Sequence, residues 1–264
     1  MNDISLILEP PIARVRLRRP GRRNAMSREM WRALPDFCAR IASMSEALVV
    51  VFEGSEGHFC AGADINEFGT VFGDAAATHD YNQAIQDALK ALIALDRPAI
   101  AALQGNCIGA GLALALCCDL RFCAEDAWLA IPPARHGLLY GFVETGRLIQ
   151  TVGTARAKDL LFSARRIEVA EALSIGLVDR ALATDALQPE ILAYAGELAK
   201  LSQHSIRGAK IAVDAIAGGL ASESPAFRGL VVQAAAGEDY LEGRSAYLNK
   251  RAPEFSFRGR LTPL

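Results

Sequence analysis

The chain has 264 residues, of which 52% are hydrophobic and 22% are charged, and its formal net charge is −2. This length allows one or two domains, and the composition is that of a globular protein with a large apolar core rather than a disordered or fibrous one. A slightly acidic chain with no basic run longer than two residues is not expected to bind nucleic acid.

We expect neither a signal peptide nor a membrane span in this sequence. Residues 1–11 lack the basic flank and the long apolar run of a signal peptide, and no apolar segment reaches the roughly 18 residues that span a bilayer. The six cysteines lie mostly in apolar runs without CxxC spacing, which favours buried, reduced thiols over disulfides or metal ligands. We therefore expect a cytoplasmic protein with no metal site and no membrane partner.

The first part of the chain predicts strands and helices in alternation. Apolar alternation indicates strands, and an apolar spacing of three to four residues indicates helices. The expected elements are a strand hairpin over 4–8 and 12–17, a helix from its N-cap Ser27 to about 44, a strand over 48–52, a helix over 75–95 and a strand over 99–103.

Two turns built from small residues follow two of these strands. The strand over 48–52 leads to Ala61, Gly62 and Ala63, and the strand over 99–103 leads through glycines to a buried helix that starts near Gly109. The first turn of a helix has unpaired N–H groups at the positive end of the helix dipole. Each turn is therefore expected to offer one main-chain N–H to an oxyanion or a polarised carbonyl.

The rest of the chain becomes progressively helical. Two short strands over 120–123 and 127–130 are followed by a break at 131–133, a loop over 137–141 and a helix over 142–152. The further helices are expected over 154–162 with Thr154 as cap, 169–174, 187–202, 205–217, 224–236 and 238–250.

Several common kinds of active site do not fit these motifs. The glycines lack the GxGxxG spacing of a dinucleotide site, and no P-loop lysine follows them. There is no GxSxG elbow, and neither Cys60 nor Cys107 has an evident histidine partner in the sequence. Dinucleotide-binding enzymes, P-loop proteins and serine or cysteine hydrolases are therefore disfavoured.

Five motifs follow one another along the chain: RRPGRRNAM (18–26), HFCAGADINEF (58–68), the stretch over 104–119, GLVD (176–179) and EGRSAYLNKR (242–251). In this order and spacing they resemble the enoyl-CoA hydratase/isomerase family, also called the crotonase superfamily. The resemblance implies an α/β fold: a crotonase-like spiral of ββα units that binds acyl-CoA over residues 1–190, and a helical C-terminal trimerisation region over 191–264. It also implies an acyl-CoA substrate, with coenzyme A as part of the substrate and no tightly bound cofactor, and a homotrimer or a hexamer of two trimers.

The resemblance also implies roles for individual residues. The amides of Ala63 and Ala110 occupy the positions whose N–H groups hold the thioester oxygen and stabilise an enolate. Residues expected to contact coenzyme A are Arg22, Arg23, Ala61, Asp64, Ile65, Tyr247 and Lys250. The alternatives are that Asp64 only caps the short helix after Ala63, and that the basic residues are solvated surface charges.

The sequence departs from the family at the two positions that matter most for hydration. Hydratases of the family use two glutamates, and the aligned positions here hold Ala113 and Pro133, neither of which transfers a proton. The remaining candidates near the pocket are Asp64, Glu67, His136, Tyr140 and Glu144, and of these Tyr140 and Glu144 are the strongest. Glu144 is alternatively a first-turn acid favoured by the helix dipole or paired with Arg147.

Three hypotheses follow from this departure. The first is an isomerase-like or decarboxylase-like enzyme that needs at most one acid/base group. The second is a catalytically silent acyl-CoA-binding protein. The third is a hydratase that uses a displaced carboxylate, Glu144 or Asp64, while Glu67 and His136 are expected to be ordinary exposed or packed side chains. The loop over 69–74 and the helix over 75–95 are expected to shape the acyl pocket.

Overall fold

The structure is a computed structural model that describes residues 3–261, and it is built around two sheets. The larger has six strands in the order β1 (Ile4–Glu9), β2 (Ile12–Leu17), β3 (Val49–Gly54), β4 (Ala99–Leu103), β6 (Leu120–Ala124) and β9 (Arg180–Leu182). β1 and β2 form the expected antiparallel hairpin, and the other strand pairs of this larger sheet are parallel. The smaller sheet consists of β5 (Asn106–Ile108), β7 (Trp128–Ala130) and β8 (Arg166–Ile167).

Helices follow and cover these strands. They are α1 (Arg28–Ser43), α2 (Phe68–Val71), α3 (Ala75–Ile93), α4 (Ala110–Leu116), α5 (Phe142–Val152), α6 (Thr154–Ser163), α7 (Val169–Ser174), α8 (Leu187–Lys200), α9 (Gln203–Ala217), α10 (Pro225–Ala236) and α11 (Glu238–Leu248). Two short 3₁₀ turns are η1 (Ile65–Glu67) and η2 (Pro133–His136). The units β4–β5–α4 and β6–β7–α5 each place one strand in each sheet before a helix, which is the expected spiral of ββα units.

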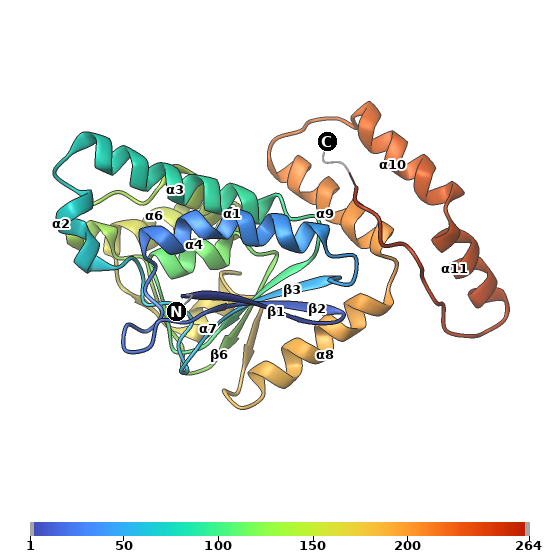
Figure 1. Ribbon diagram of the computed structural model, residues 1–264, viewed down its shortest axis with the longest axis horizontal. Coiled ribbons are helices and arrows are strands. Elements are labelled where there is room, and N and C mark those ends of the chain that lie inside the picture. The colour runs from blue at the N-terminus through green and yellow to red at the C-terminus, as the bar shows by residue number, and fades with distance from the viewer. Residues whose placement is uncertain (1–2, 262–264) are drawn as a thin grey trace.

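The larger sheet is buried on both faces because its strands alternate between two apolar cores. Val50 and Phe52 point into the main core with α1, α3 and α4, whereas Val49 and Val51 point into a second core with α8. Figure 1 shows α1 and α3 on one side of the strands and α8 on the other. Strands such as β3 and β4 are apolar at nearly every position because side chains on both of their faces are buried.

Most local expectations are confirmed, and one cap is wrong. Ser27 accepts the N–H of Met30 as the N-cap of α1, and Asp64 caps η1 through the N–H of Asn66. Thr154, expected to cap α6, is instead its first helical residue, because Gly153 at φ +79° occupies the cap position. The strands β5, β8 and β9 were not expected, since two or three residues are too few to show an apolar period. All six cysteines are free and buried.

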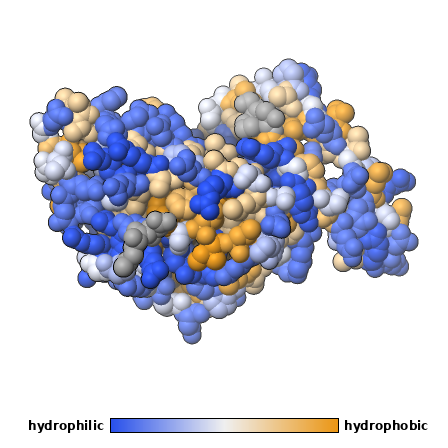
Figure 2. Space-filling view, viewed as in Figure 1, coloured by the Kyte–Doolittle hydropathy of each residue, from blue (hydrophilic) through white to orange (hydrophobic). Residues whose placement is uncertain are grey.

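The C-terminal helices extend away from the sheets. Figure 1 shows α10 and α11 standing clear of the strands, and Figure 2 shows apolar atoms on the surface of this region. Lys210 on α9 holds the start of this helical region against the sheet by an ion pair of 2.9 Å with Asp119. The boundary expected at residue 190 falls inside α8, which packs on the larger sheet. Over residues 3–261, no helix combines the length and the apolar character needed to cross a bilayer.

Candidate active site

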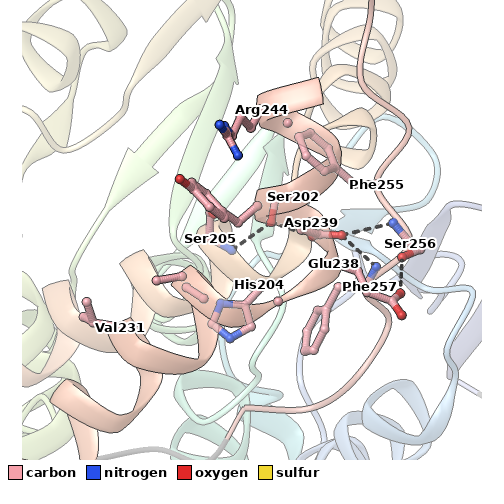
Figure 3. Close-up of a pocket in the computed structure, with 15 residues that line it drawn as sticks. Ser202, His204, Ser205, Val231, Glu238, Asp239, Arg244, Phe255, Ser256 and Phe257 are labelled. Carbon is pink, nitrogen blue, oxygen red and sulfur yellow. Dashed lines mark hydrogen bonds between the residues drawn. The ribbon is translucent and has the colours of Figure 1, made fainter. Parts of the chain in front are cut away.

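Two cavities are candidates for a binding site. The larger, of about 910 Å³, lies among α1, α3, α5 and the two small-residue turns. The smaller, of about 560 Å³, lies among α9, α10, α11 and the final tail. Figure 3 shows that Asp239 in this smaller cavity is engaged by the hydroxyl of Ser202 and by the N–H groups of Ser256 and Phe257. The polar groups of the smaller cavity are thus used to hold the final tail against the C-terminal helices.

Backbone hydrogen bonds hold the two turns at the larger cavity together. Cys60 donates its N–H to the carbonyl of Asn106 at 2.8 Å, and Ile108 donates to the carbonyl of Cys60 at 3.0 Å. A Cβ on Gly111 would lie 2.6 Å from the Cys60 carbonyl oxygen, so only glycine allows α4 to start this close to the other turn. Gly109 reaches the start of α4 at φ +51°, a region that side chains other than glycine rarely adopt.

The two expected amides have no internal acceptor. The residues beside Ala63 are paired, with the Met26 N–H donating to the Gly62 carbonyl at 2.8 Å and the Asp64 N–H donating to the Met26 carbonyl at 2.9 Å. Among residues 3–261, neither the Ala63 N–H nor the N–H of Ala110, the first residue of α4, donates a hydrogen bond. Both residues line the larger cavity, so both donors are available to a ligand oxygen.

Glu144 is the one carboxylate among the described residues that line this cavity. It lies in the first turn of α5 and is only 6% exposed. Burial raises its pKa, and the hydrogen bonds from its own N–H and from Gln86 only partly oppose this effect. Gln86 Nε2 donates to Glu144 Oε2 at 3.3 Å. The suggested pairing of Glu144 with Arg147 is wrong, because Arg147 Nε donates to the Leu116 carbonyl at 3.1 Å.

Tyr140 joins the loop before α5 to the second turn. Its hydroxyl donates to the carbonyl oxygen of Gly109 at 3.3 Å, one residue before Ala110. Burial, with the nearby charge of Glu144, raises the pKa of Tyr140 well above its ordinary value. Tyr140 is therefore a protonated donor that fixes the turn, and it is not a base.

The positions of the two missing glutamates face the same cavity. Ala113 on α4 and Pro133 at the start of η2 both line it, so two acids of a hydratase would have been placed correctly for their work. Exposed His136 also lies on the wall. Half-buried Glu67 instead accepts the N–H of Arg28 at 2.8 Å.

The residues expected to hold coenzyme A are only partly brought together. Ala61 and Ile65 line the cavity. Asp64 does not: it accepts hydrogen bonds from Asn66 and Arg19, which lower its pKa although burial opposes the shift. It is therefore poorly placed to serve as the displaced hydratase carboxylate.

The basic residues and the C-terminal aromatic residue lie outside this cavity. Arg22 and Arg23 are exposed on the turn before Met26, where the Arg23 carbonyl accepts the N–H of Ala61 at 2.9 Å. Tyr247 and Lys250 lie at the end of α11, and Figure 1 places α11 at the opposite end of the molecule from α2, which lines the cavity. Within one chain they do not reach the site, because α10 and α11 extend away from it.

The sequence did not reveal Gln86, Trp31 and Tyr81 as parts of the cavity wall. Tyr81 and Trp31 read as core residues, and a glutamine between apolar helix positions reads as solvent-exposed. Its position gave the one signal in the sequence, since Gln86 lies on the helix over 75–95 that was expected to shape the acyl pocket. In residues 3–261, no cluster of three or more histidines, cysteines or acids is arranged to hold a metal ion.

Comparison with known proteins agrees with this geometry. A sequence model of the enoyl-CoA hydratase/isomerase family matches residues 9–258. The chain is 34% identical over 254 residues to enoyl-CoA hydratase domain-containing protein 2, mitochondrial, of Mus musculus, covering 92% of this chain and 84% of the relative. It is 33% identical over 250 residues to the probable enoyl-CoA hydratase echA8 of Mycobacterium leprae, covering 92% and 94%.

A solved structure shows the same fold throughout. The crystal structure of a putative enoyl-CoA hydratase/isomerase family protein from Hyphomonas neptunium superposes with a TM-score of 0.94 at 36% identity, and it covers 97% of this chain and 98% of its own. Both the spiral of ββα units and the C-terminal helices are included in that match. The chain therefore belongs to the enoyl-CoA hydratase/isomerase family.

Proposed function

We propose that the protein is an isomerase that moves a carbon–carbon double bond in an enoyl-CoA thioester, with Glu144 as the proton carrier. The observation that carries this proposal is that a single buried carboxylate shares a cavity with two unpaired main-chain donors. Hydration by the two-glutamate mechanism needs two acids, and the corresponding positions are Ala113 and Pro133. Isomerisation needs only one group, because the proton removed from one carbon is returned to another.

The steps follow from these positions. The Glu144 carboxylate removes a proton from C2 of a 3-enoyl thioester; the electron pair of that C–H bond forms a double bond between C1 and C2, and the carbonyl π pair moves onto the thioester oxygen. The N–H groups of Ala63 and Ala110 hold the resulting oxyanion. The oxyanion then restores the carbonyl, the C1–C2 π pair becomes the double bond between C2 and C3, and the former C3–C4 π pair takes the proton from Glu144 at C4.

The expected rate contributions of the two amides and of Glu144 support these roles. One donor of an oxyanion hole contributes about 10²–10³ in rate, and a positioned acid/base contributes about 10²–10⁴. Burial raises the pKa of Glu144, which makes its ionised form a stronger base than an ordinary surface glutamate.

Decarboxylation is the second candidate on the same framework, because it uses the two amides without a base. It is less well supported, since the ionised Glu144 carboxylate would repel a substrate carboxylate bound in the same cavity. The single proton of the Tyr140 hydroxyl is already donated to the Gly109 carbonyl, so orienting the departing carboxylate would require that hydrogen bond to break.

The test is a panel of 3-enoyl-CoA, 2-enoyl-CoA and malonyl-type CoA thioesters, assayed with the wild-type protein and with Glu144→Gln. We expect the 3-enoyl substrates to be converted to conjugated 2-enoyl products, seen by ultraviolet absorbance. Glu144→Gln should lower kcat by about 10²–10⁴ while acyl-CoA binding, measured by calorimetry, is retained. Hydration of 2-enoyl-CoA, or decarboxylation, at a higher rate than isomerisation would reject the proposal. Binding without turnover of any substrate would point to the silent acyl-CoA-binding protein.

We also propose that the protein is a homotrimer, or a hexamer of two trimers, in which a neighbouring chain completes the coenzyme A site. Support comes from the exposed apolar side chains of α10 and α11, such as Val232 and Leu248 at 67% each. The position of α11, which carries Tyr247, at the opposite end of the molecule from α2 agrees with this arrangement (Figure 1).

A further inference from the structure

The carboxyl group of Glu144 has a single side-chain partner among the described residues, and that partner is neutral. Gln86, on α3, donates through Nε2 to Glu144 Oε2 at 3.3 Å, and both residues line the cavity of about 910 Å³. The two residues are 58 positions apart, so the contact exists only because α3 packs beside α5. No cation forms an ion pair with Glu144 within residues 3–261.

The backbone of Gly141 also confines the carboxylate of Glu144. A Cβ built on Gly141 would lie 2.5 Å from Oε1, and still nearer to Oε2, so the Glu144 head group rests directly on the backbone of Gly141. The Gly141 backbone on one side and the Gln86 amide on another leave the head group little freedom to rotate. An acid that must reach two carbons of one substrate needs this kind of fixed placement.

The other groups around Glu144 do not balance its charge. Tyr140 on the preceding loop and Cys117 at the end of α4 are close enough that the charge of Glu144 raises the pKa of each. Arg147, one turn further along α5, is turned toward the carbonyl of Leu116 and toward Asp214 on α9. Among the described residues, no cation forms an ion pair with Glu144, and its ionised form depends on the amide of Gln86 and on its own N–H.

A glutamine suits a carboxyl group that changes its protonation state during each turnover. Its NH₂ group donates to an ionised carboxylate, and its carbonyl oxygen accepts from the O–H of a carboxylic acid, so one side chain can bind both forms. An arginine or lysine in its place would favour only the ionised form and would weaken the base.

We propose that Gln86 is a positioning residue for Glu144, an amide that orients the carboxyl group and stays hydrogen-bonded to it in both protonation states. This inference rests on the proposed role of Glu144 as proton carrier. It assigns to α3 a part in proton transfer in addition to shaping the acyl pocket.

Two substitutions at position 86 are expected to act in opposite directions. Gln86→Met keeps the length of the side chain but removes both polar groups, so the pKa of Glu144 rises further and the acid limb of the kcat/KM profile moves to higher pH. Gln86→Lys places a cation beside the carboxylate, so the pKa of Glu144 falls and the acid limb moves to lower pH. We expect kcat to drop about two- to tenfold in Gln86→Met, the size of the net contribution of a typical hydrogen bond, with KM unchanged.

Gln83→Met is the matched control, because Gln83 lies on the same helix but donates to exposed Asp87 at 2.8 Å. The same side chain is thereby replaced on α3 at a place away from the cavity. Neither the pKa of Glu144 nor kcat should change in this variant.

The pKa of Glu144 is to be measured without substrate, by infrared titration of the carboxyl band that disappears in Glu144→Gln. Shifts in opposite directions in Gln86→Met and Gln86→Lys, with none in Gln83→Met, support the inference. An unchanged Glu144 titration in both position-86 variants overturns it, whatever the activity. If the titration shifts as expected while the wild-type protein isomerises no enoyl-CoA, the contact stands and only the proposed reaction fails.

Discussion

The N–H of Ala110 provides a test of the proposed oxyanion site at a single atom. Ala110 is the first residue of α4, a position at which helices accept proline because the missing N–H would be unpaired anyway. Ala110→Pro should therefore leave the fold intact and lower kcat/KM by about 10²–10³, measured with the 3-enoyl substrate.

Thr154→Pro is the control for this substitution. Thr154 is likewise the first residue of a helix, α6, and follows a glycine with positive φ, but it does not line the cavity. It should keep full activity. If Ala110→Pro folds and turns over at the wild-type rate, the Ala110 amide does not hold the oxyanion.

Glu144 should also reveal its burial through the pH dependence of stability. Burial raises its folded-state pKa above the value in the unfolded chain, so ionisation favours the unfolded state. The stability associated with this group is complete below the unfolded pKa and is lost as pH rises through the folded pKa. Glu144→Gln should therefore become more stable than wild type as pH rises through that range, measured by urea unfolding between acid and neutral pH.

The control here is Glu190→Gln. Glu190 also lies in the first turn of a helix, α8, but it is exposed, so the helix dipole acts on both residues and burial on only one. A gain in Glu190→Gln equal to that in Glu144→Gln would show that burial is not the cause.

Individual residues were harder to predict than the chain's motifs. Ala63 and Ala110 follow from small residues after buried strands, and Ala113 and Pro133 follow from ungapped alignment within two motifs. Gln86 does not follow from any pattern, because its partner is 58 positions away and the contact depends on how α3 and α5 pack. The exclusion of Arg147 as a partner for Glu144 likewise required the direction of a side chain, which spacing along a helix leaves open.

At the scale of elements, α4 and the turn over 60–63 are expected to behave as one unit. In Gly111→Ala the added Cβ would meet the Cys60 carbonyl oxygen at 2.6 Å, so the two turns must separate. We expect a loss of about 1–3 kcal/mol in the free energy of unfolding and a lower kcat, because the two amides no longer face one oxygen. Urea unfolding and the isomerase assay measure these effects.

Gly146→Ala is the matched control within α5. A Cβ there meets no heavy atom within 4 Å, and alanine favours the helix by roughly 0.5–1 kcal/mol over glycine. The control should gain stability where Gly111→Ala loses it. Equal effects in the two variants would mean that close packing of the turns is unimportant.

Element boundaries were predictable where the period was long and the ends were marked. α5 and α7 begin and end where the sequence indicated, because Gly153 and Gly176 stop them. β5, with three residues, lay hidden in what read as a glycine turn, and it forms only by pairing with β7 across the smaller sheet. Strands of this length are set by their partners and not by their own residues.

At the scale of the whole molecule, the family resemblance supplied what local patterns could not. The strands and helices in chain order were readable, but the two-sheet arrangement needs the pairing of β4 with β6 and of β5 with β7, which no local period encodes. The extension of α10 and α11 away from the sheets was equally hidden, since their sequences read as ordinary helices. That extension determines which residues one chain can bring to its own cavity.

The C-terminal helices carry the last prediction, on assembly. Val232 and Leu248 are large apolar side chains exposed in a single chain, and burying such surface is the main driving force for association. A charge at both positions, Val232→Glu with Leu248→Glu, should convert a trimer or hexamer into monomers, measured by light scattering after size exclusion. Because Tyr247 and Lys250 would then no longer reach a neighbouring cavity, coenzyme A affinity should fall by about tenfold or more, measured by calorimetry.

Phe162→Glu, which changes an exposed apolar residue on α6, is the control and should leave mass and affinity unchanged. The prediction fails if the wild-type protein is monomeric at all concentrations and the double variant binds coenzyme A with the wild-type affinity. Each chain would then complete its own coenzyme A site.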